Sequence, residues 1–331
     1  MMNNKIYIFS HGDLKIQDGT LYLENEDGIE EITINGIEEI YILGEVKINK
    51  EFLNTVLDRK IIIHFFNYYG YYSGSFFPKE HSCNSQLLIK QTEYYLNHYK
   101  RLKIARLFVE GAIHNILQVV KYYKNRGREL ERIEESIISL ANLIGECSAI
   151  DELMAIEGNV RNYYYQGFDK ILDNPDFVFE QRSKRPPKNF LNTLISFGNS
   201  MLYTDVLSQI YYTGLEPKIG FLHTSNFRRF SLNLDIAEIF KPIIVDRVIF
   251  TVVNRNIITS DDFEYMSEGI MLKEKGRKVF VDYYEEKMNS IINLRETGTS
   301  ISYRNLIRLE AENLENYFLY GTEYKPFKAK W

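Results

Sequence analysis

The 331-residue sequence has few of the features that mark secreted, membrane or disulfide-stabilised proteins. It contains two cysteines, Cys83 and Cys147, which lie far apart and match no metal-binding spacing. We expect both thiols to be reduced, as is typical of a cytoplasmic protein. No apolar run reaches the roughly 18 residues that a membrane helix needs, and the start lacks the basic and apolar regions of a signal peptide. These absences predict a cytoplasmic protein without a membrane segment.

Four common catalytic motifs are also absent. The sequence contains no phosphate-binding P-loop, no dinucleotide-binding GxGxxG, no GxSxG of serine hydrolases and no HExxH of zinc proteases. Most common enzyme classes are therefore disfavoured. The 25 tyrosines and 21 phenylalanines could stack on bases, but aromatic residues more often fill a core.

Residues 1–80 have the pattern of a small antiparallel β domain. Short β-prone runs are separated by turn-forming pairs such as Asp27-Gly28 and Asn35-Gly36, and a short helix is expected at 51–60. The aromatic run 68–77 is typical of a last hairpin.

The pattern changes near residue 85. No proline occurs between Pro78 and Pro175, and helical spacing of apolar residues extends through 87–123, 130–147 and 149–165. We therefore predict an α+β protein, with a β domain over residues 1–84 and a larger all-α domain over residues 85–331.

Charge is distributed unevenly between these two parts. The net charge of the whole chain is −5. Residues 1–80 hold 13 acidic and 7 basic residues (net −6), and residues 81–331 hold 32 acidic and 33 basic residues (net +1). Because nucleic-acid binding depends on the local field near a site, the overall acidity does not exclude it.

A histidine and two carboxylates lie close together in an apolar region. Asp235 and Glu238 are three residues apart and would share one face of a helix, and His223 precedes them. Imidazole and carboxylate groups are ligands of ions such as Mn²⁺ and Mg²⁺, and an unpaired buried carboxylate is costly. This pattern predicts a metal site, although a lone histidine is more often structural.

Glu157 is a second candidate. In the expected helix 149–165 it lies four residues after Leu153 and three before Val160, inside an apolar stripe. A carboxylate there needs a partner, which a metal could be. The alternative is a glutamate at the edge of the stripe whose end reaches solvent.

A basic segment at 181–188 is a candidate DNA contact. Its cations include Arg182, Lys184 and Arg185, and two prolines favour an extended conformation that could follow a phosphate backbone. The alternative is a solvated surface loop. Arg228 and Arg229 would add positive charge beside the metal site and are also candidate DNA contacts.

Residues 157–247 contain an ordered series of motifs. In chain order they are Glu157-Gly158, Tyr163–Tyr165, Arg185-Pro186-Pro187, Ser196-Phe197-Gly198, Gly220-x-x-His223, Ser231-Leu-x-x-Asp235-x-x-Glu238, Lys241-Pro242 and Asp246-Arg247. In order, spacing and residue type, this series resembles the CRISPR-associated integrase and endonuclease family, which inserts new spacers during adaptation. Residues 7–14 and 324–331 resemble members from type I systems.

The resemblance implies a fold, a ligand set and partners. It implies an N-terminal β domain used for dimerisation and an all-α catalytic domain that binds metal and DNA. It implies that Glu157, His223 and Glu238 ligate one Mg²⁺ or Mn²⁺, with Asp235 as a supporting acidic residue. It also implies pre-spacer and repeat/leader DNA as substrates, a homodimer, and a small ferredoxin-like companion protein.

The implied reaction is attack of a DNA 3′-hydroxyl on a phosphodiester, or hydrolysis where water is the nucleophile. Two other classes remain open at this point. One is a metal-dependent hydrolase of small phosphoesters, which the extended basic segment disfavours. The other is a non-catalytic DNA-binding scaffold with a structural metal.

Overall fold

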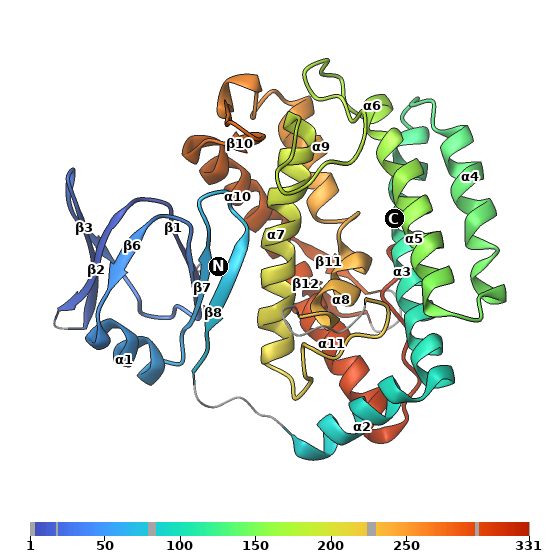
Figure 1. The fold of residues 1–331 in the computed structure, drawn as a ribbon, viewed down its shortest axis with the longest axis horizontal. Helices are drawn as coiled ribbons and strands as arrows, with labels where there is room; N and C mark the ends of the chain where they lie inside the picture. Colours follow the sequence, from blue (N-terminus) through green and yellow to red (C-terminus); the bar gives the residue numbers. More distant parts are fainter. Residues whose placement is uncertain (1–3, 18, 79–83, 224–229, 295–297, 331) are drawn as a thin grey trace. The chain divides into compact units, whose positions relative to one another are not determined.

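The structure is a computed structural model that describes residues 4–17, 19–78, 84–223, 230–294 and 298–330. The chain divides into two compact units, Met1–His81 and Ser82–Trp331. The first unit is rich in β-strands and the second is mainly helical, which confirms the predicted α+β class (Figure 1).

The β-rich unit contains two four-stranded sheets and one helix within its described residues. The strand orders are β1-β5-β7-β8 and β4-β3-β2-β6. The elements are β1 (Lys5–Ile8), β2 (Gly12–Gln17), β3 (Thr20–Asn25), β4 (Gly28–Ile32), β5 (Glu39–Ile42), β6 (Val46–Ile48), α1 (Lys50–Asp58), β7 (Ile62–Phe66) and β8 (Tyr72–Phe76).

Strand pairing in this unit is mixed, whereas the sequence predicted antiparallel pairing. The pairs β2–β3, β3–β4 and β7–β8 are antiparallel, as expected for strands joined by short turns. The pairs β1–β5, β5–β7 and β2–β6 are parallel. Parallel neighbours need long connections, and each of these pairs is separated in sequence by at least one other element. Turn residues mark hairpins but give no sign of such crossovers.

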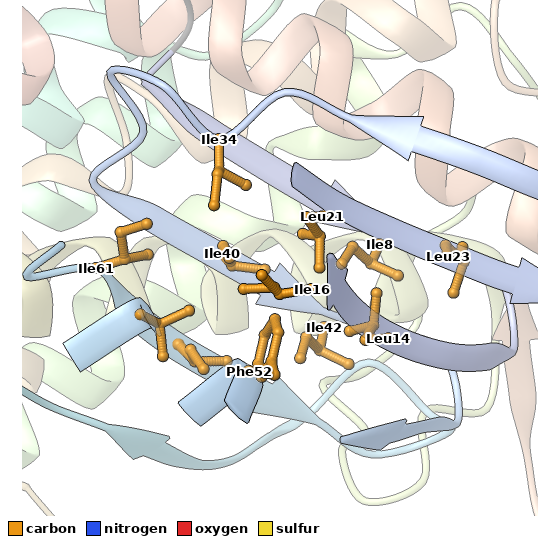
Figure 2. Close-up of a cluster of buried hydrophobic side chains, with 12 residues drawn as sticks. Ile8, Leu14, Ile16, Leu21, Leu23, Ile34, Ile40, Ile42, Phe52 and Ile61 are labelled. Atoms are coloured by element: carbon orange, nitrogen blue, oxygen red, sulfur yellow. The ribbon is translucent and has the colours of Figure 1, made fainter. Parts of the chain in front are cut away.

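The core of the β-rich unit lies where the two sheets and α1 meet (Figure 2). Ile40 and Ile42 contribute from β5, and Leu21 contributes from β3. Phe52, one turn before Val56 on α1, is fully buried among them. Because alternate residues of a strand face opposite sides, Ile40 and Ile42 face this core together. Truncation of Phe52 to alanine would cost about 3–5 kcal/mol.

The second unit contains ten α-helices and two short hairpins among its described residues, so it is not wholly helical. The helices are α2 (Ser85–Leu96), α3 (His98–Lys124), α4 (Glu131–Ala141), α5 (Ile150–Gln166), α6 (Phe168–Ile171), α7 (Phe190–Tyr211), α8 (Leu232–Phe240), α9 (Val245–Asn254), α10 (Glu274–Asn289) and α11 (Tyr303–Tyr320). The hairpins are β9 (Phe263–Tyr265) with β10 (Ile270–Leu272), and β11 (Ile291–Asn293) with β12 (Ser300–Ser302).

The helical pattern predicted over 87–123 is divided at Asn97. This residue ends α2, and its side chain accepts a hydrogen bond of 3.0 Å from the backbone N–H of Lys100 in the first turn of α3. Asparagine is a favoured N-cap because its side-chain oxygen satisfies a free N–H of the first turn. The apolar spacing continues across the break, so spacing alone does not reveal it.

Helix α7 lies at the centre of the helical unit, in contact with α8, α9, α11 and β10 (Figure 1). Nearly all of its side chains are buried, including several polar ones such as Asn192, Thr204 and Asp205. Helix α8 packs between α7 and α3. The residues of α8 are therefore held on two sides by long helices.

The segment after α11 supports α8 through Asn115 of α3. The Asn115 side chain donates to the carbonyls of Ile239 at 2.9 Å and Phe327 at 3.1 Å, and it accepts from Ala329 N–H at 2.8 Å. The ring of Phe327 stacks on Phe240, the last residue of α8, with centroids 6.0 Å apart. One buried amide thus ties α3, α8 and the C-terminal segment together.

Within the described residues, no helix is both long enough and apolar enough to cross a membrane.

Candidate active site

Asp235 in α8 organises the loop that carries His223. Its carboxylate is fully buried and accepts backbone N–H bonds from Phe221 at 2.5 Å, Leu222 at 3.0 Å and His223 at 2.9 Å. Its Oδ1 also lies 2.8 Å from Nδ1 of His223. Because the partner is a carboxylate, Nδ1 donates the proton and Nε2 keeps its lone pair. Asp235 therefore fixes both the orientation and the tautomer of His223.

Close backbone approach at Gly220 makes this arrangement possible. A Cβ atom there would lie 2.7 Å from the backbone carbon of Ser231 and 2.9 Å from Oδ2 of Asp235. The N–H of Gly220 donates to the Ser231 hydroxyl at 2.9 Å, and that hydroxyl donates to the carbonyl of Lys218 at 2.7 Å. The glycine of the Gly220-x-x-His223 motif thus lets the loop lie against the start of α8.

The electrostatics around His223 favour a positive charge on the ring, which either a proton or a metal ion at Nε2 would supply. Burial lowers the pKa of His223, but the hydrogen bond and negative charge of Asp235 raise it more, and Glu238 raises it further. The net effect is a pKa above the ordinary value. A positive charge is therefore favoured at this position.

Glu238 and Glu157 are joined through Arg161. Glu238 in α8 pairs with Arg161 of α5 and with Lys241, which follows α8. Glu157 lies one turn before Arg161 and accepts a bond of 3.4 Å from its Nε. Two carboxylates thus share the positive charge of Arg161 and Lys241.

The pKa values of the two carboxyl groups are shifted in opposite directions. Burial would raise the pKa of Glu238, but Lys241, Arg161 and His223 bring it down to about 2. Burial and the negative charge of Glu238 raise the pKa of Glu157. Glu157 therefore lies where a further positive charge would be stabilising.

Asp246 in α9 is a further buried carboxyl near Arg161. Both its oxygens are buried and accept no hydrogen bond of ordinary geometry from the described part of the chain, and burial raises its pKa to about 7. The charge of Arg161 and the hydroxyl of Tyr164 partly offset that rise. One terminal nitrogen of Arg161 is also buried, with no hydrogen-bond partner among the residues that the structure describes. Arg161 thus has negative charge on more than one side.

The three predicted ligands lie in one neighbourhood, but their side chains are not arranged to hold a single ion. Coulombic effects on pKa link Glu157, His223 and Glu238, so the structure brings these three into one neighbourhood. Among the described residues, no three His, Cys, Asp or Glu side chains are arranged to hold one ion. Glu238 instead contacts Arg161 and Lys241.

The basic segment approaches this site through Lys184. Burial, Arg182 and Lys241 lower the pKa of Lys184, whereas Glu157 raises it, so Lys184 lies near Glu157 and Lys241. Arg182 instead donates to Asn192 at 2.9 Å and Ser196 at 3.1 Å, which ties the segment to α7.

Of the three remaining candidate DNA contacts, the structure describes one. Arg185 is exposed. Arg228 and Arg229 lie outside the described residues. DNA contact by these arginines stays a prediction.

Known proteins identify the family. The sequence matches the family model described as "CRISPR associated protein Cas1" over residues 6–286. It is 51% identical over 330 residues to "CRISPR-associated endonuclease Cas1 2" of Thermodesulfovibrio yellowstonii, with both chains covered completely. The chain belongs to the Cas1 family. The resemblance read from the motifs is confirmed, while membership of a type I system stays a prediction.

Two solved structures share this fold. A Cas1 protein from Thermotoga maritima is 43% identical and superposes with a TM-score of 0.84, over 98% of this chain and 100% of that one. A casposase bound to integration product superposes with a TM-score of 0.89 over 98% of this chain and 94% of that one. Its identity is only 20%, so this second likeness shows a common fold.

Sequence reasoning missed the cations of the site. Arg161 and Lys241 follow Glu157 and Glu238 by four and three residues, spacings at which helical side chains of opposite charge pair. Those spacings could have revealed them. Nothing in the sequence, however, indicates that Arg161 of α5 also forms an ion pair with Glu238 of α8.

Proposed function

We propose that this chain is a divalent-metal-dependent DNA endonuclease and integrase that inserts new spacers into a CRISPR array. As a Cas1 protein it is an enzyme, and its relatives are named endonucleases. The metal dependence and the transesterification are our inference from the site.

The observation that carries this proposal is the hold of Asp235 on His223. Burial of a carboxylate is costly unless it is hydrogen-bonded, and Asp235 is satisfied by three backbone N–H groups and the imidazole, so it holds His223 firmly in one orientation. Metal-binding histidines commonly donate their second nitrogen to a carboxylate in this way. The lone pair of Nε2 is then available as a ligand.

Glu157 and Glu238 complete a donor set that suits Mg²⁺ or Mn²⁺. Hard divalent ions prefer carboxylate oxygens, and Mn²⁺ also accepts imidazole. The structure supports this because the site concentrates negative charge, which Arg161 and Lys241 balance here. When bound, the ion would polarise the scissile phosphodiester and stabilise its developing negative charge.

The chain's own residues would then position the DNA. Lys184, within electrostatic reach of Glu157, is suited to hold a phosphate of the strand at the site, and exposed Arg185 could contact the next. The 3′-hydroxyl of the incoming strand loses its proton to solvent and forms the new bond to phosphorus, while the old phosphorus–oxygen bond breaks and the released 3′-oxygen takes up a proton. One phosphodiester replaces another, so the step needs no ATP. Water as the nucleophile gives a nick.

The assembly and location are part of the proposal. We propose that the β-rich unit mediates a homodimer and that a small ferredoxin-like protein joins two such dimers, so that two DNA ends are held apart at a fixed distance. A cytoplasmic location agrees with Cys147, which is a free, buried thiol.

Strand transfer into a repeat-containing plasmid tests this function. A short duplex with 3′-hydroxyl ends is incubated with the chain and the plasmid in Mn²⁺, and a matched duplex with 3′-deoxy ends serves as the control. Joined product is expected only with the hydroxyl, and only without a chelator. Product that survives chelation would contradict a metal-dependent integrase. Hydrolysis of small phosphoesters without any action on DNA would favour the hydrolase alternative.

A further inference from the structure

Two arginines of the helical unit lie over the same tyrosine. The guanidinium carbon of Arg247, in α9, is 4.2 Å from the ring centroid of Tyr122 in α3 and 5.5 Å from that of Tyr123. The guanidinium carbon of Arg126, just beyond the end of α3, is 4.6 Å from the Tyr122 centroid. Arg126 is exposed and Arg247 is partly exposed.

A third cation is held in the same manner nearby. The Nζ of Lys287, near the end of α10, lies 4.0 Å from the ring centroid of Tyr303, the first residue of α11. Helices α9 and α10 pack together, as do α10 and α11. Arg247 is close enough to influence both residues electrostatically. Together, Arg126, Arg247, Lys287, Tyr122 and Tyr303 are called the tyrosine-backed cluster.

The cations of the tyrosine-backed cluster have no acidic partner among the residues that the structure describes. Two other cations near the end of α3 do have acidic partners: Arg128 pairs with Asp173, and Lys124 pairs with Glu134. One terminal nitrogen of Arg247 is buried and donates to no acceptor within the described part of the chain.

This arrangement leaves positive charge uncompensated. Burial and the charge of Arg247 lower the pKa of Lys287 to about 8. The positive end of α11 begins at Tyr303 and adds to the field. Contacts with tyrosine rings stabilise each cation, but they do not satisfy its N–H donors. An oxyanion would satisfy these donors and relieve the repulsion between the cations.

We propose that the tyrosine-backed cluster binds the phosphate backbone of a nucleic-acid strand, with Arg247 and Lys287 each contacting a phosphate and Arg126 extending the contact outward. This inference rests on the proposed function, since it assigns a second stretch of the DNA substrate to these helices. The cations come from α9, α10 and the turn just after α3, whereas the predicted metal ligands lie on α5, α8 and the loop before α8. Cations spread over several elements suit a strand better than a single small anion.

Salt dependence of DNA binding tests the assignment. A fluorescent duplex with single-stranded 3′ ends is titrated with the chain in chelator, at several salt concentrations, and the double variant Arg247→Gln/Lys287→Gln is compared. Each lost phosphate contact reduces the slope of log K against log salt by about 0.7–0.9. We expect the double variant to have a slope shallower by about 1.5.

Controls separate charge from folding. Arg128→Gln removes a charge just after α3, two residues from Arg126. Asp173 already neutralises that charge, so the variant should leave the slope unchanged. Arg247→Lys keeps the charge over Tyr122 and should retain most of the wild-type slope. Melting curves of each variant show whether the fold is intact.

The outcomes distinguish this inference from the proposed function. Suppose that the double variant and Arg128→Gln give the same salt slope while the wild-type chain still transfers strands. The cluster then does not bind DNA, and this inference fails while the proposed function stands. If the wild-type chain binds no DNA and transfers no strand, the proposed function fails. Inorganic phosphate that abolishes the difference between wild type and double variant at millimolar concentration would indicate a site for a free anion, and would overturn the strand assignment.

Discussion

Arg161 of α5 and Glu238 of α8 form a buried ion pair between residues that are 77 positions apart in the sequence. The pair joins the helix that carries Glu157 to the helix that carries Asp235 and Glu238. It explains how one guanidinium group holds carboxylates from two helices close together. Because Arg161 already supplies positive charge to these carboxylates, an incoming metal ion would replace that charge.

Removal of Arg161 should destabilise the protein. Arg161→Met leaves Glu238 buried with Lys241 as its remaining partner, and broken buried ion pairs cost about 3–5 kcal/mol. Urea unfolding measures the change. The matched control is Arg128→Met, which breaks the partly exposed pair with Asp173 and should cost roughly 0–1 kcal/mol.

The same variant should respond more strongly to metal. If the ion and Arg161 serve the same carboxylates, Mn²⁺ will raise the melting temperature of Arg161→Met more than that of the wild type. Equal shifts in the two proteins would mean that Arg161 and the metal act at different places.

Two glycines near the site should respond in opposite ways to alanine. A Cβ at Gly220 would lie within 3 Å of Ser231 and Asp235, whereas one at Gly158, exposed in the middle of α5, would meet nothing within 4 Å. Gly220→Ala should therefore lower stability by about 1–3 kcal/mol through backbone movement. Gly158→Ala should raise it by about 0.5–1 kcal/mol through helix propensity.

Urea unfolding of both glycine variants checks this contrast. Strand transfer by Gly220→Ala should fall with its stability, because the shifted loop carries His223. If Gly220→Ala is as stable and active as the wild type, the close approach of the loop to α8 is not required.

The sequence predicted the α+β class and the proximity of Glu157, His223 and Glu238. Local patterns sufficed for the class, because turn pairs and apolar spacing differ between residues 1–80 and the rest. The proximity came from a series of motifs spread over 157–247, since spacing within one helix relates only Asp235 to Glu238. Spacing treated these two carboxylates as equals, whereas the structure gives them different partners: Asp235 holds the His223 loop and Glu238 holds two cations.

Other features depend on contacts that no local pattern encodes. The parallel pairing of β1, β5 and β7 requires crossovers between distant segments. The pair between Arg161 and Glu238 depends on how α5 packs near α8. The capping role of Asn97 is local, but uninterrupted apolar spacing concealed it.

A titrating carboxyl under the C-terminal segment should make stability depend on pH. Glu310 in α11 accepts from the Tyr324 hydroxyl at 2.6 Å and from Phe327 N–H at 3.1 Å. Burial nonetheless raises its pKa to about 7. An unfolded glutamate titrates near 4.3, so between about pH 4.3 and 7 the folded state holds a proton that the unfolded state has lost. Stability from this group therefore falls as pH rises through that window and levels off above it.

Replacement of Glu310 by glutamine should remove this dependence. Relative to the wild type, Glu310→Gln should gain about 2–3 kcal/mol between pH 5 and pH 8, as measured by urea unfolding. Asp246, whose pKa is also raised to about 7, titrates in both proteins and cancels in the difference. The exposed Glu312→Gln on the same helix should track the wild type at every pH. Parallel curves for Glu310→Gln and the wild type would refute the assignment.

The central claim is that Glu157, His223 and Glu238 hold one divalent ion while Asp235 positions His223. Calorimetric titration of Mn²⁺ into the chain without DNA tests it most directly. We predict one ion per chain, no measurable binding by His223→Ala or Glu238→Gln, and binding roughly 10–100-fold weaker in Asp235→Asn, which keeps the side-chain shape but loses the charge. Mn²⁺ affinity that is unchanged in His223→Ala and Glu238→Gln would contradict the account.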